Sequence, residues 1–591
     1  MNIYKGRLAL LREEMKKNGV HATIIPGTDP HISEYLAKHW QERNWIAGFT
    51  GSAGTAVVTL DKAALWTDSR YFIQAENQLA GTSFSLMKDR MPDTPDIISW
   101  LKSELREGEK LGLNPQMFTH QQFTSYQKSL SSKNISIQSV DLIDVIWTDR
   151  PALPNNLVEI YEEKYAGKSA QEKLKDVRAE MQKVDANIYV IASLDEIAWL
   201  LNIRGSDVNF NPLVISYAVV ENNSVNLFID EQKLDNKAKE YLDSIGVWVK
   251  PYSSITDFLS QLDAQSKVLF DSTRLNQSLY EALPSTAKVI ETLSPITLLK
   301  SIKNEIEIEG IRQAMIKDGV ALTQFFIWLE NNIDKSITEY TVGEELLKYR
   351  ARQDLAKGPS FGTICGYAAN GAMNHYSAKK DTAALLGRDA LVLIDSGGQY
   401  LDGTTDITRT MKFGEPTEKE RKDYTLVLKG MIALSCAKFP HNTRGSQLDV
   451  LARQFLWQNN LNFGHGTGHG VGHYLCVHEG PQNIRTDENP TVLQEGMIVS
   501  NEPGMYRDGE YGIRIENLIL VRKTEKTSFG IFYEFETLTL FPIDTNLIDR
   551  TLFTDSEKEW LNNYHQMVYD RLSPNLSEDE KSWLKEKCKT L

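Results

Sequence analysis

The chain has 591 residues, of which 41% are hydrophobic and 24% are charged, and its formal net charge is −14. A chain of this length is too long for one hydrophobic core, so about two to four domains of ordinary globular composition are expected. The negative charge argues against a nucleic acid or an anionic membrane as a partner, because either requires a basic face.

The cysteines and the N-terminal segment indicate the cellular compartment in which the protein is expected. Cys365, Cys436, Cys476 and Cys588 are scattered and have no CxxC spacing, which is typical of neither a disulfide framework nor a zinc ribbon. Residues 1–19 form an amphipathic pattern without the apolar region of a signal peptide. No apolar run approaches the roughly 18 residues of a membrane span. We therefore expect a cytoplasmic protein.

The first 150 residues alternate apolar runs with turn residues and amphipathic stretches. The expected strands are 23–26, 54–60 and 63–68, and the expected helices are 1–19, 71–79 and 96–105. This alternation is typical of an α/β domain, which we place at residues 1–152.

A second stretch repeats the pattern of the first. After a proline-containing linker at 151–156, the sequence predicts a helix at 169–184 and strands at 187–191, 213–220 and 225–230. Trp199 and Gly205-Ser206 precede this second hairpin, just as Trp45 and Gly51-Ser52 precede the first one 154 residues earlier. The repeat predicts a second copy of the α/β domain at residues 153–300, although two unrelated hairpins would also fit.

Long helical periodicity opens a third domain near residue 300. Helices are expected at 305–331 and 341–353, and a charged helical tail is expected at 556–589 after a hairpin-rich region. We place this domain at residues 301–591, with a C-terminal extension from about 530 to 591.

The third domain contains a stretch, residues 462–479, that is rich in histidine and glycine. Four of the chain's eleven histidines, His465, His469, His473 and His478, lie here among five glycines. Imidazole both binds metal and moves protons near neutral pH, and glycine lets the backbone bend closely around a ligand. The alternative for this stretch is a mobile surface loop. Cys476, which lies in the same stretch, is expected to be a small buried hydrophobe and not a nucleophile.

Four acidic residues of this domain are placed so that folding brings them together. Asp395 ends an apolar strand, and a strand–turn–strand leads to Asp406 eleven residues later. Glu502 and Glu516 are joined in the same way through a hairpin with an Asp508-Gly509 turn. Four acids in one place repel each other and lose hydration, which they tolerate only when protonated or neutralised by cations.

With one histidine, these acids offer one nitrogen and four carboxylate donors, a set that suits two divalent ions. Oxygen-rich donors favour Mn²⁺, Co²⁺ or Fe²⁺ over thiolate-bound zinc. Two such ions would activate a shared water against a polarised carbonyl, which is two-metal hydrolysis. Each of these acids alone has an ordinary explanation as a turn residue, so the prediction depends on the whole set. Asp402, a further acid beside Gly403, is expected to be a turn residue and not a ligand.

Together these motifs resemble those of the pita-bread metallopeptidases. The matching segments are Asp395-Ser-Gly, Asp406-Ile-Thr-Arg-Thr, His465-Gly-Thr-Gly-His469-Gly-Val-Gly, Asn501-Glu502-Pro-Gly and Gly512-Ile-Arg-Ile-Glu516-Asn. The chain is most similar to the long, three-domain Xaa-Pro aminopeptidases (aminopeptidase P), over its whole length. The resemblance implies an α/β and α+β multidomain protein, with two creatinase-like N-terminal α/β domains followed by a pita-bread catalytic domain.

The resemblance also implies roles for single residues. The implied metal ligands are Asp395, Asp406, His469, Glu502 and Glu516. Asp406 and Glu516 would bridge two divalent ions, in the first place Mn²⁺, with Co, Fe or Zn as alternatives. Glu502 would also handle the proton of the bridging water. His375 and His478 would contact the scissile peptide and steady its oxyanion, and His465 would lie near the proline pocket.

For two further residues, His473 and Arg70, the sequence leaves the role open. His473 matches no role in the family, and the default expectation for it is a surface position on a helix or strand. Arg70 belongs either to a cover over the partner's site in a homodimer, which the family suggests, or to a structural salt bridge.

The implied activity is removal of the N-terminal residue from peptides with proline in second position. Proline lacks the amide hydrogen and has a fixed φ, so a pocket shaped for its ring makes this bond the preferred target. The rivals are a prolidase restricted to X-Pro dipeptides, a methionine aminopeptidase, metal-free creatinase chemistry and a non-catalytic peptide-binding pseudo-peptidase. The duplicated N-terminal domains favour the aminopeptidase, and the complete ligand set argues against the last two.

Overall fold

The computed structural model describes residues 3–591, and the chain divides into two compact units. One unit comprises Met1–Glu163 and Lys168–Thr297, and the other comprises Lys164–Gly167 and Leu298–Leu591. None of the helices in residues 3–591 is both long enough and apolar enough to cross a membrane.

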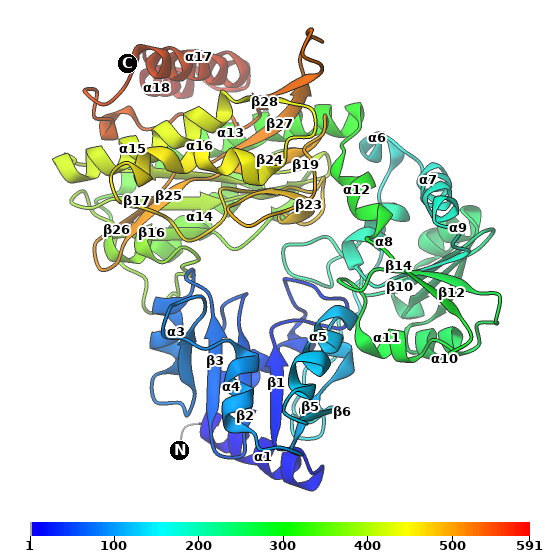
Figure 1. Cartoon of the computed structure of the whole chain (residues 1–591). Coiled ribbons are helices and arrows are strands. Elements are labelled where there is room, and N and C mark those ends of the chain that lie inside the picture. The colour runs from blue at the N-terminus through cyan, green and yellow to red at the C-terminus, as the bar shows by residue number, and fades with distance from the viewer. Residues whose placement is uncertain (1–2) are drawn as a thin grey trace. The chain divides into compact units, whose positions relative to one another are not determined.

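The first unit begins with a six-stranded sheet of order β4-β3-β2-β1-β5-β6, with helices along its faces (Figure 1). Its elements are α1 (Ile3–Lys17), β1 (Ala22–Pro26), α2 (Glu42–Ala47), β2 (Thr55–Thr59), β3 (Ala63–Thr67), α3 (Phe72–Leu79), β4 (Ser85–Lys88), α4 (Ile97–Glu104), β5 (Lys110–Leu113), α5 (His120–Ser131) and β6 (Ser136–Ser139). Every predicted element is present within two residues of its expected bounds. Residues 1 and 2 of the first predicted helix lie outside the described residues.

The same unit contains a second six-stranded sheet, of order β12-β11-β10-β8-β13-β14. In chain order the elements of this part of the chain are β7 (Glu159–Ile160), α6 (Glu163–Ala166), α7 (Ala170–Lys183), β8 (Ile188–Ile191), α8 (Leu194–Leu200), β9 (Ile203–Arg204), β10 (Tyr217–Glu221), β11 (Val225–Ile229), α9 (Asn236–Ser244), β12 (Val247–Pro251), α10 (Ile255–Ser260), β13 (Lys267–Phe270), α11 (Gln277–Glu281) and β14 (Lys288–Glu291). Of these, α6 lies largely in the segment Lys164–Gly167 of the other unit. In both sheets two antiparallel pairings lie between parallel ones, in the same order. The predicted duplication of the α/β domain is confirmed.

One predicted strand of this second sheet begins later than expected. The sequence predicts a strand over 213–220, but β10 begins at Tyr217. The Asp207 carboxylate, which is ion-paired with the buried Lys233 at 2.5 Å, accepts the backbone N–H of Ile215 at 2.8 Å. This amide is therefore not available for sheet pairing, and the apolar residues 213–215 are buried in an irregular segment instead.

Arg70 also belongs to the first unit. Its guanidinium donates two hydrogen bonds to Asp68, at 2.8 and 2.7 Å. The expected salt bridge is present, and a part of Arg70 in a cover over a partner's site stays a prediction.

The second unit is built from short antiparallel sheets covered by helices. Its strands are β15 (Ala356–Pro359), β16 (Ile364–Tyr367), β17 (Val392–Ser396), β18 (Gly398–Tyr400), β19 (Gly403–Thr404), β20 (Ile407–Met411), β21 (Lys438–Pro440), β22 (Gly468–Gly470), β23 (Glu479–Ile484), β24 (Ile498–Asn501), β25 (Gly504–Arg507), β26 (Tyr511–Arg514), β27 (Asn517–Lys523) and β28 (Phe532–Thr537). They form sheets of order β15-β18-β19, β16-β17-β20 and β21-β28-β27-β24-β22-β23, and the hairpin β25-β26.

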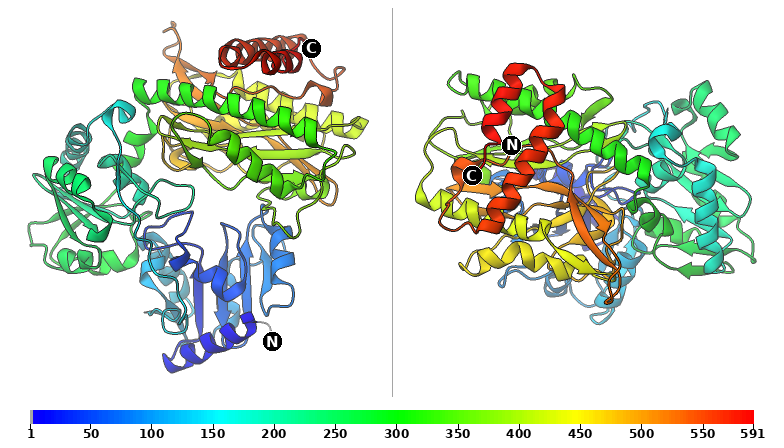
Figure 2. Two further views of the ribbon diagram at one scale, coloured as in Figure 1. Left: turned by 180° about the vertical axis from the view of Figure 1, so that it is seen from behind. Right: turned by 90° about the horizontal axis from the view of Figure 1, so that it is seen from above.

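The helices of this unit carry much of its core. They are α12 (Pro295–Ser301), α13 (Glu305–Asn332), α14 (Glu339–Arg350), α15 (Glu418–Ser435), α16 (Gly445–Trp457), α17 (Asp555–Leu572) and α18 (Glu578–Lys587). The C-terminal helices α17 and α18 pack against α13, as both views of Figure 2 show. Apolar residues of α13, α15, α17 and α18 share one buried cluster. The predicted helical tail is thus two helices, separated at Ser573-Pro574, where proline has no backbone N–H to continue the first.

Candidate metal centre

Strand pairing brings the two aspartates together. Asp395 lies in β17, directly opposite Thr408 of β20, and Asp406 immediately precedes β20. Asp395 and Asp406 are 8% and 4% exposed, so both carboxylates are buried. The short strand–turn–strand expected from the sequence therefore places Asp395 and Asp406 close together, as predicted.

A second pairing positions the two glutamates. β24 and β27 are antiparallel, and Asn501 at the end of β24 is opposite Asn517 at the start of β27. Glu502 and Glu516 flank these asparagines, so both lie at the same end of the strand pair. The hairpin β25-β26 connects them, and its turn contains Gly509 at φ +73°, a conformation that favours glycine.

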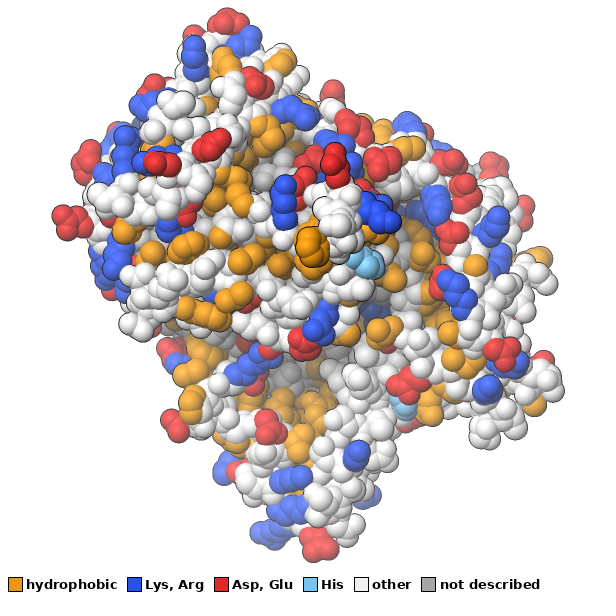
Figure 3. Space-filling view, turned by 45° about the horizontal axis from the view of Figure 1, so that its top comes forward, with side chains coloured by type: hydrophobic (Ala, Val, Ile, Leu, Met, Phe, Trp, Pro, Cys, Tyr) orange, Lys and Arg blue, Asp and Glu red, His pale blue; other side chains and the backbone are white. Residues whose placement is uncertain are grey.

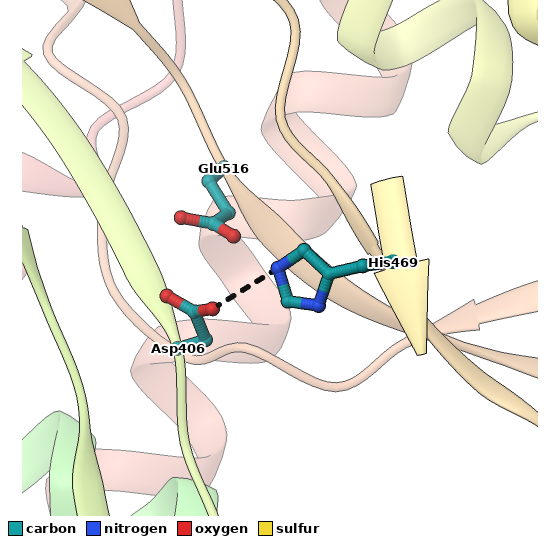
Figure 4. A group of neighbouring side chains, drawn as sticks. All are labelled: Asp406, His469 and Glu516. Carbon is teal, nitrogen blue, oxygen red and sulfur yellow. Dashed lines mark ion pairs between the residues drawn. The ribbon is translucent and has the colours of Figure 1, made fainter. Parts of the chain in front are cut away.

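His469 completes the group from β22. Its Nδ1 lies 2.9 Å from the Gly470 carbonyl, which can only accept a hydrogen bond, so the proton is on Nδ1. The other ring nitrogen, Nε2, faces the acids, 3.5 Å from Asp406 Oδ2 and 3.5 Å from Glu502 Oε1. Figure 4 shows Asp406, His469 and Glu516 converging from three different segments, and their ligand atoms lie within 4.8 Å of one another.

The electrostatics of this group fit bound cations. Burial, together with the charge of Asp406, raises the pKa of the Asp395 carboxyl despite the opposing Arg514. Burial and the neighbouring acids also raise the pKa of Glu502 to about 7 and that of Glu516 well above its ordinary value. These raised pKa values reflect the cost of gathering like charges in a buried place, a cost that a divalent ion removes.

The donor set fits such ions in two further ways. The buried Oδ1 of Asp395 accepts no hydrogen bond from residues 3–591, so a lone pair remains for a ligand bond. The hydrogen bond from His469 Nδ1 to a backbone carbonyl is the arrangement that orients an imidazole ligand. Four carboxylates and one imidazole nitrogen suit manganese, cobalt or iron better than a soft metal.

Side chains outside the predicted ligand set hold the carboxylates. Arg514 of β26 donates to Asp395 Oδ2 at 2.5 Å and to the Tyr506 hydroxyl at 2.7 Å. The Thr408 hydroxyl donates to Glu516 Oε2 at 2.8 Å. Sequence reasoning missed Arg514 and Tyr506 as site residues. The only signal for Arg514 was its place inside the motif Gly512-Ile-Arg-Ile-Glu516.

Of the three predicted substrate histidines, His478 contacts this group directly and His465 contacts Tyr506, which Arg514 links to it. The rings of His478 and His469 meet edge to face, with centroids 4.4 Å apart. The Nε2 of His465 lies 2.8 Å from the Tyr506 hydroxyl, which Arg514 connects to Asp395. His375 is half-buried in the segment that follows β16.

Three expectations for neighbouring residues were tested by the structure. His473 is buried at 3% exposure, with Nε2 3.1 Å from the Tyr165 carbonyl, so the expected surface position on a helix or strand is wrong. Burial is possible because that carbonyl partners the ring. Cys476 is half-buried rather than buried. Asp402 is ion-paired with Lys317 at 2.6 Å, in keeping with the expectation that it is not a ligand.

Family models match nearly the whole chain. Residues 7–150 and 149–307 each match the creatinase/prolidase N-terminal domain, residues 309–523 match metallopeptidase family M24, and residues 531–591 match the C-terminal region of peptidase M24. A probable Xaa-Pro aminopeptidase P from Coprinopsis cinerea is 44% identical over 98% of this chain and 97% of the relative. The chain belongs to the Xaa-Pro aminopeptidases of metallopeptidase family M24. It is therefore a hydrolase, and the expected fold class, creatinase-like domains followed by a pita-bread catalytic domain, is confirmed.

Other relatives agree with this assignment. Xaa-Pro aminopeptidase 1 of Dictyostelium discoideum is 42% identical over 98% of this chain and 96% of the relative. The crystal structure of X-prolyl aminopeptidase from Caenorhabditis elegans, described as a cytosolic enzyme with a di-nuclear active site, superposes with a TM-score of 0.96 at 35% identity, over 100% of both chains. An Xaa-Pro dipeptidase from Bacillus anthracis, 24% identical with a TM-score of 0.52 over 64% of this chain, shares the fold.

Proposed function

We propose that the protein is a two-metal aminopeptidase that removes the N-terminal residue from peptides with proline in second position. The observation that carries this proposal is the convergence of Asp406, His469 and Glu516, with Glu502 3.5 Å from His469. The relatives and the di-nuclear structural neighbour support the same activity.

The proposed metal ligands are the five residues of the predicted set. Asp395, Asp406, His469, Glu502 and Glu516 offer the donors, and Asp406 and Glu516 are proposed to bridge the two ions. Manganese is the proposed native metal, because carboxylates dominate the set and no cysteine belongs to it. Ions bound there would supply Lewis acidity, which polarises a carbonyl and acidifies water.

The chain's own side chains are proposed to move the proton and to hold the reacting peptide. Glu502, whose carboxyl pKa is raised by burial to about 7, is suited to accept a proton from the attacking water and to pass it to the leaving nitrogen. His478, in edge-to-face contact with His469, is placed to donate to the substrate oxygen as charge develops there. His375 is proposed to give a second such contact.

The substrate class follows from the chemistry of proline. The leaving nitrogen of an X-Pro bond carries no hydrogen, so an enzyme that binds its substrate as an extended strand loses a hydrogen bond there. His465 is proposed to border the proline pocket, next to Tyr506, with which it hydrogen-bonds. Carboxylates of the centre would hold the free amine of the preceding residue, which limits cleavage to the N-terminal residue.

Asp406→Ala is the direct test of the metal centre. It should abolish turnover of Arg-Pro-Pro and lower the metal content, which in wild type should be two ions per chain by mass spectrometry. Asp402→Ala is the matched control, because Asp402 lies four residues away and pairs with Lys317 instead. Full activity of Asp406→Ala would contradict the two-metal proposal.

The choice of peptide separates two activities of this fold. The manganese-loaded enzyme should hydrolyse Arg-Pro-Pro and release free arginine. A protein active only on the dipeptide Arg-Pro would be a prolidase, and the aminopeptidase assignment would then be wrong.

Three further expectations become proposals. Lys and Arg are mixed with Asp and Glu over the face shown in Figure 3, which supports a peptide rather than a nucleic acid as the partner. A cytoplasmic location is proposed because the C. elegans neighbour is described as cytosolic. The homodimer expected from the family stays a prediction, which sedimentation would check.

A further inference from the structure

A buried carboxylate outside the metal set gathers hydrogen bonds from a single segment of chain. Glu339, the first residue of α14, is 1% exposed. Its oxygens accept the Tyr367 backbone N–H at 2.8 Å, the Tyr376 hydroxyl at 2.8 Å and the Ala384 backbone N–H at 2.8 Å. The Asn370 side chain adds bonds of 3.0 and 3.2 Å. We call the segment of residues 367–384 the His375 loop.

These contacts require a carboxylate. A buried charge is costly unless it is well hydrogen-bonded, and every described contact of Glu339 comes from a hydrogen-bond donor. Its position in the first turn of α14 adds the favourable dipole of the helix N-terminus. An amide at this position would point its own N–H₂ group at one of these donors.

Backbone bonds tie the same two segments together. The Glu339 N–H donates to the Ala384 carbonyl at 3.0 Å, and the Leu386 N–H donates to the Ile337 carbonyl at 2.8 Å. The start of α14 and the end of the His375 loop are therefore joined through both backbone and side chain.

The opposite side of the His375 loop lies against the metal centre. Arg514, which donates to Asp395, also donates to the Asn374 carbonyl at 3.3 Å. A Cβ on Gly512 would lie 1.8 Å from the Gly371 carbonyl oxygen, so the two backbones are in direct contact. His375 thus lies between Asn374, held from β26, and Tyr376, held by Glu339.

We propose that Glu339 is a positioning residue for His375. By holding Tyr376 and both ends of the His375 loop, it fixes the imidazole relative to the metal centre, which it does not touch itself. This inference rests on the proposed function, in which His375 contacts the substrate. It adds a residue on α14, more than thirty positions from any proposed ligand or substrate histidine.

Glu339→Gln is the first test, because it removes the charge and preserves the side-chain size. The kcat for Arg-Pro-Pro should fall by roughly 10- to 100-fold, the range found when supporting residues of metal sites are changed, with KM and metal content nearly unchanged. Glu344→Gln, the same change at an exposed position of α14, should leave kcat unaltered. A kcat for Glu339→Gln equal to that of wild type would overturn the proposal.

A double mutant distinguishes positioning from a general loss of folding. In a His375→Ala background, Glu339→Gln should have little further effect on kcat, because the group that it positions is already gone. Equal losses in both backgrounds would overturn the proposal. Tyr376→Phe, which removes only one hydroxyl, should lower kcat in the same direction if Glu339→Gln fails to fold. A Tyr376→Phe enzyme with wild-type kcat would then overturn it.

Hydrogen exchange provides a readout that does not depend on activity. In Glu339→Gln, the amides of Tyr367 and Ala384 should exchange faster, while those of β24 and β27 should not change. Unchanged exchange in the His375 loop would overturn the proposal. A wild-type protein that cleaves no X-Pro peptide would instead overturn the proposed function, and the exchange result would still decide whether Glu339 holds the loop.

Discussion

A single hydrogen bond determines which nitrogen of His469 meets the acids. Nδ1 donates to the carbonyl of the next residue, Gly470, so Nε2 is the nitrogen that faces Asp406 and Glu502. The adjoining glycines also permit close packing. A Cβ on Gly468 would lie 1.9 Å from the Ser500 carbonyl oxygen, and one on Gly470 would lie 2.4 Å from that of Glu479. The glycines thus let β22 approach its neighbours closely.

At the residue scale we predict that His375→Ala and His478→Ala each lower kcat by roughly 10²–10³-fold, as expected when one donor to a developing oxyanion is lost. Steady-state kinetics on Arg-Pro-Pro would measure this effect. Both variants should bind the same amount of metal as wild type. His441→Ala, at an exposed histidine of the same unit, is the control. If either variant kept wild-type kcat, that histidine would have no role in the chemical step.

The convergence of Asp406, His469 and Glu516 was predictable from sequence because each lies in a short recognisable motif, and the two acids belong to local strand–turn–strand segments. Arg514 and Tyr506 escaped prediction because their contacts join residues far apart in the chain, such as Arg514 and Asp395. Glu339 gave no signal for the same reason. Its donors begin 28 residues later, and an acid in the first turn of a helix has an ordinary explanation in the helix dipole.

At the element scale, a buried ion cluster connects the start of the second unit to β23. Glu479, the residue after His478, lies 2.8 Å from Lys300 and 2.6 Å from Lys303, and all three side chains are 1% exposed. Lys300 belongs to α12, and Lys303 lies just before α13. The cluster therefore joins the α12–α13 segment to the strand that begins beside His478, a proposed substrate histidine.

We predict that Glu479→Gln lowers the free energy of unfolding by about 3–5 kcal/mol, because it removes the buried carboxylate that pairs with both buried lysines. Urea unfolding followed by tryptophan fluorescence would measure it. Glu495→Gln, at an exposed position before β24, should change the free energy by less than about 0.5 kcal/mol. Equal stability of the two variants would show that water or another group compensates the lysines.

The elements themselves were largely predictable, and the exceptions have local causes. The duplicated sheet followed from apolar alternation and from the repeated Trp and Gly-Ser landmarks. The late start of β10 could not be predicted in this way, because the Asp207 carboxylate accepts the hydrogen bond of the Ile215 amide and apolar periodicity does not show that contact. The burial of His473 could not be predicted either, because it depends on the Tyr165 carbonyl about 300 residues earlier in the chain.

At the scale of the whole molecule, the acids of the metal centre link stability to pH. The pKa of Glu502 is raised to about 7 in the folded protein, and those of Asp395 and Glu516 are also raised. A raised folded-state pKa means that the stability these groups contribute is complete below about pH 4.5, their ordinary range. The contribution of Glu502 is lost as the pH rises through about 7.

Chelator-treated protein should therefore become less stable from pH 5 to pH 8, whereas metal-loaded protein should not. Thermal unfolding with and without EDTA would measure the difference in Tm, which should widen with pH. Hydrogen exchange in the first sheet, β1–β6, should not respond to EDTA, because all of these acids lie in the second unit. A Tm difference that is the same at every pH would contradict this linkage.

The pairing of β24 with β27 sets the relative positions of two of the proposed metal ligands. Because side chains alternate along a strand, a slip of one residue in this pairing would turn one of the two glutamates, Glu502 or Glu516, away from the other. A mispaired chain would then hold too few oxygens on one side to bind the ions. With Glu502 and Glu516 as proposed ligands, metal affinity should therefore be highest for the native alignment, and metal binding should favour it over a chain slipped by one residue.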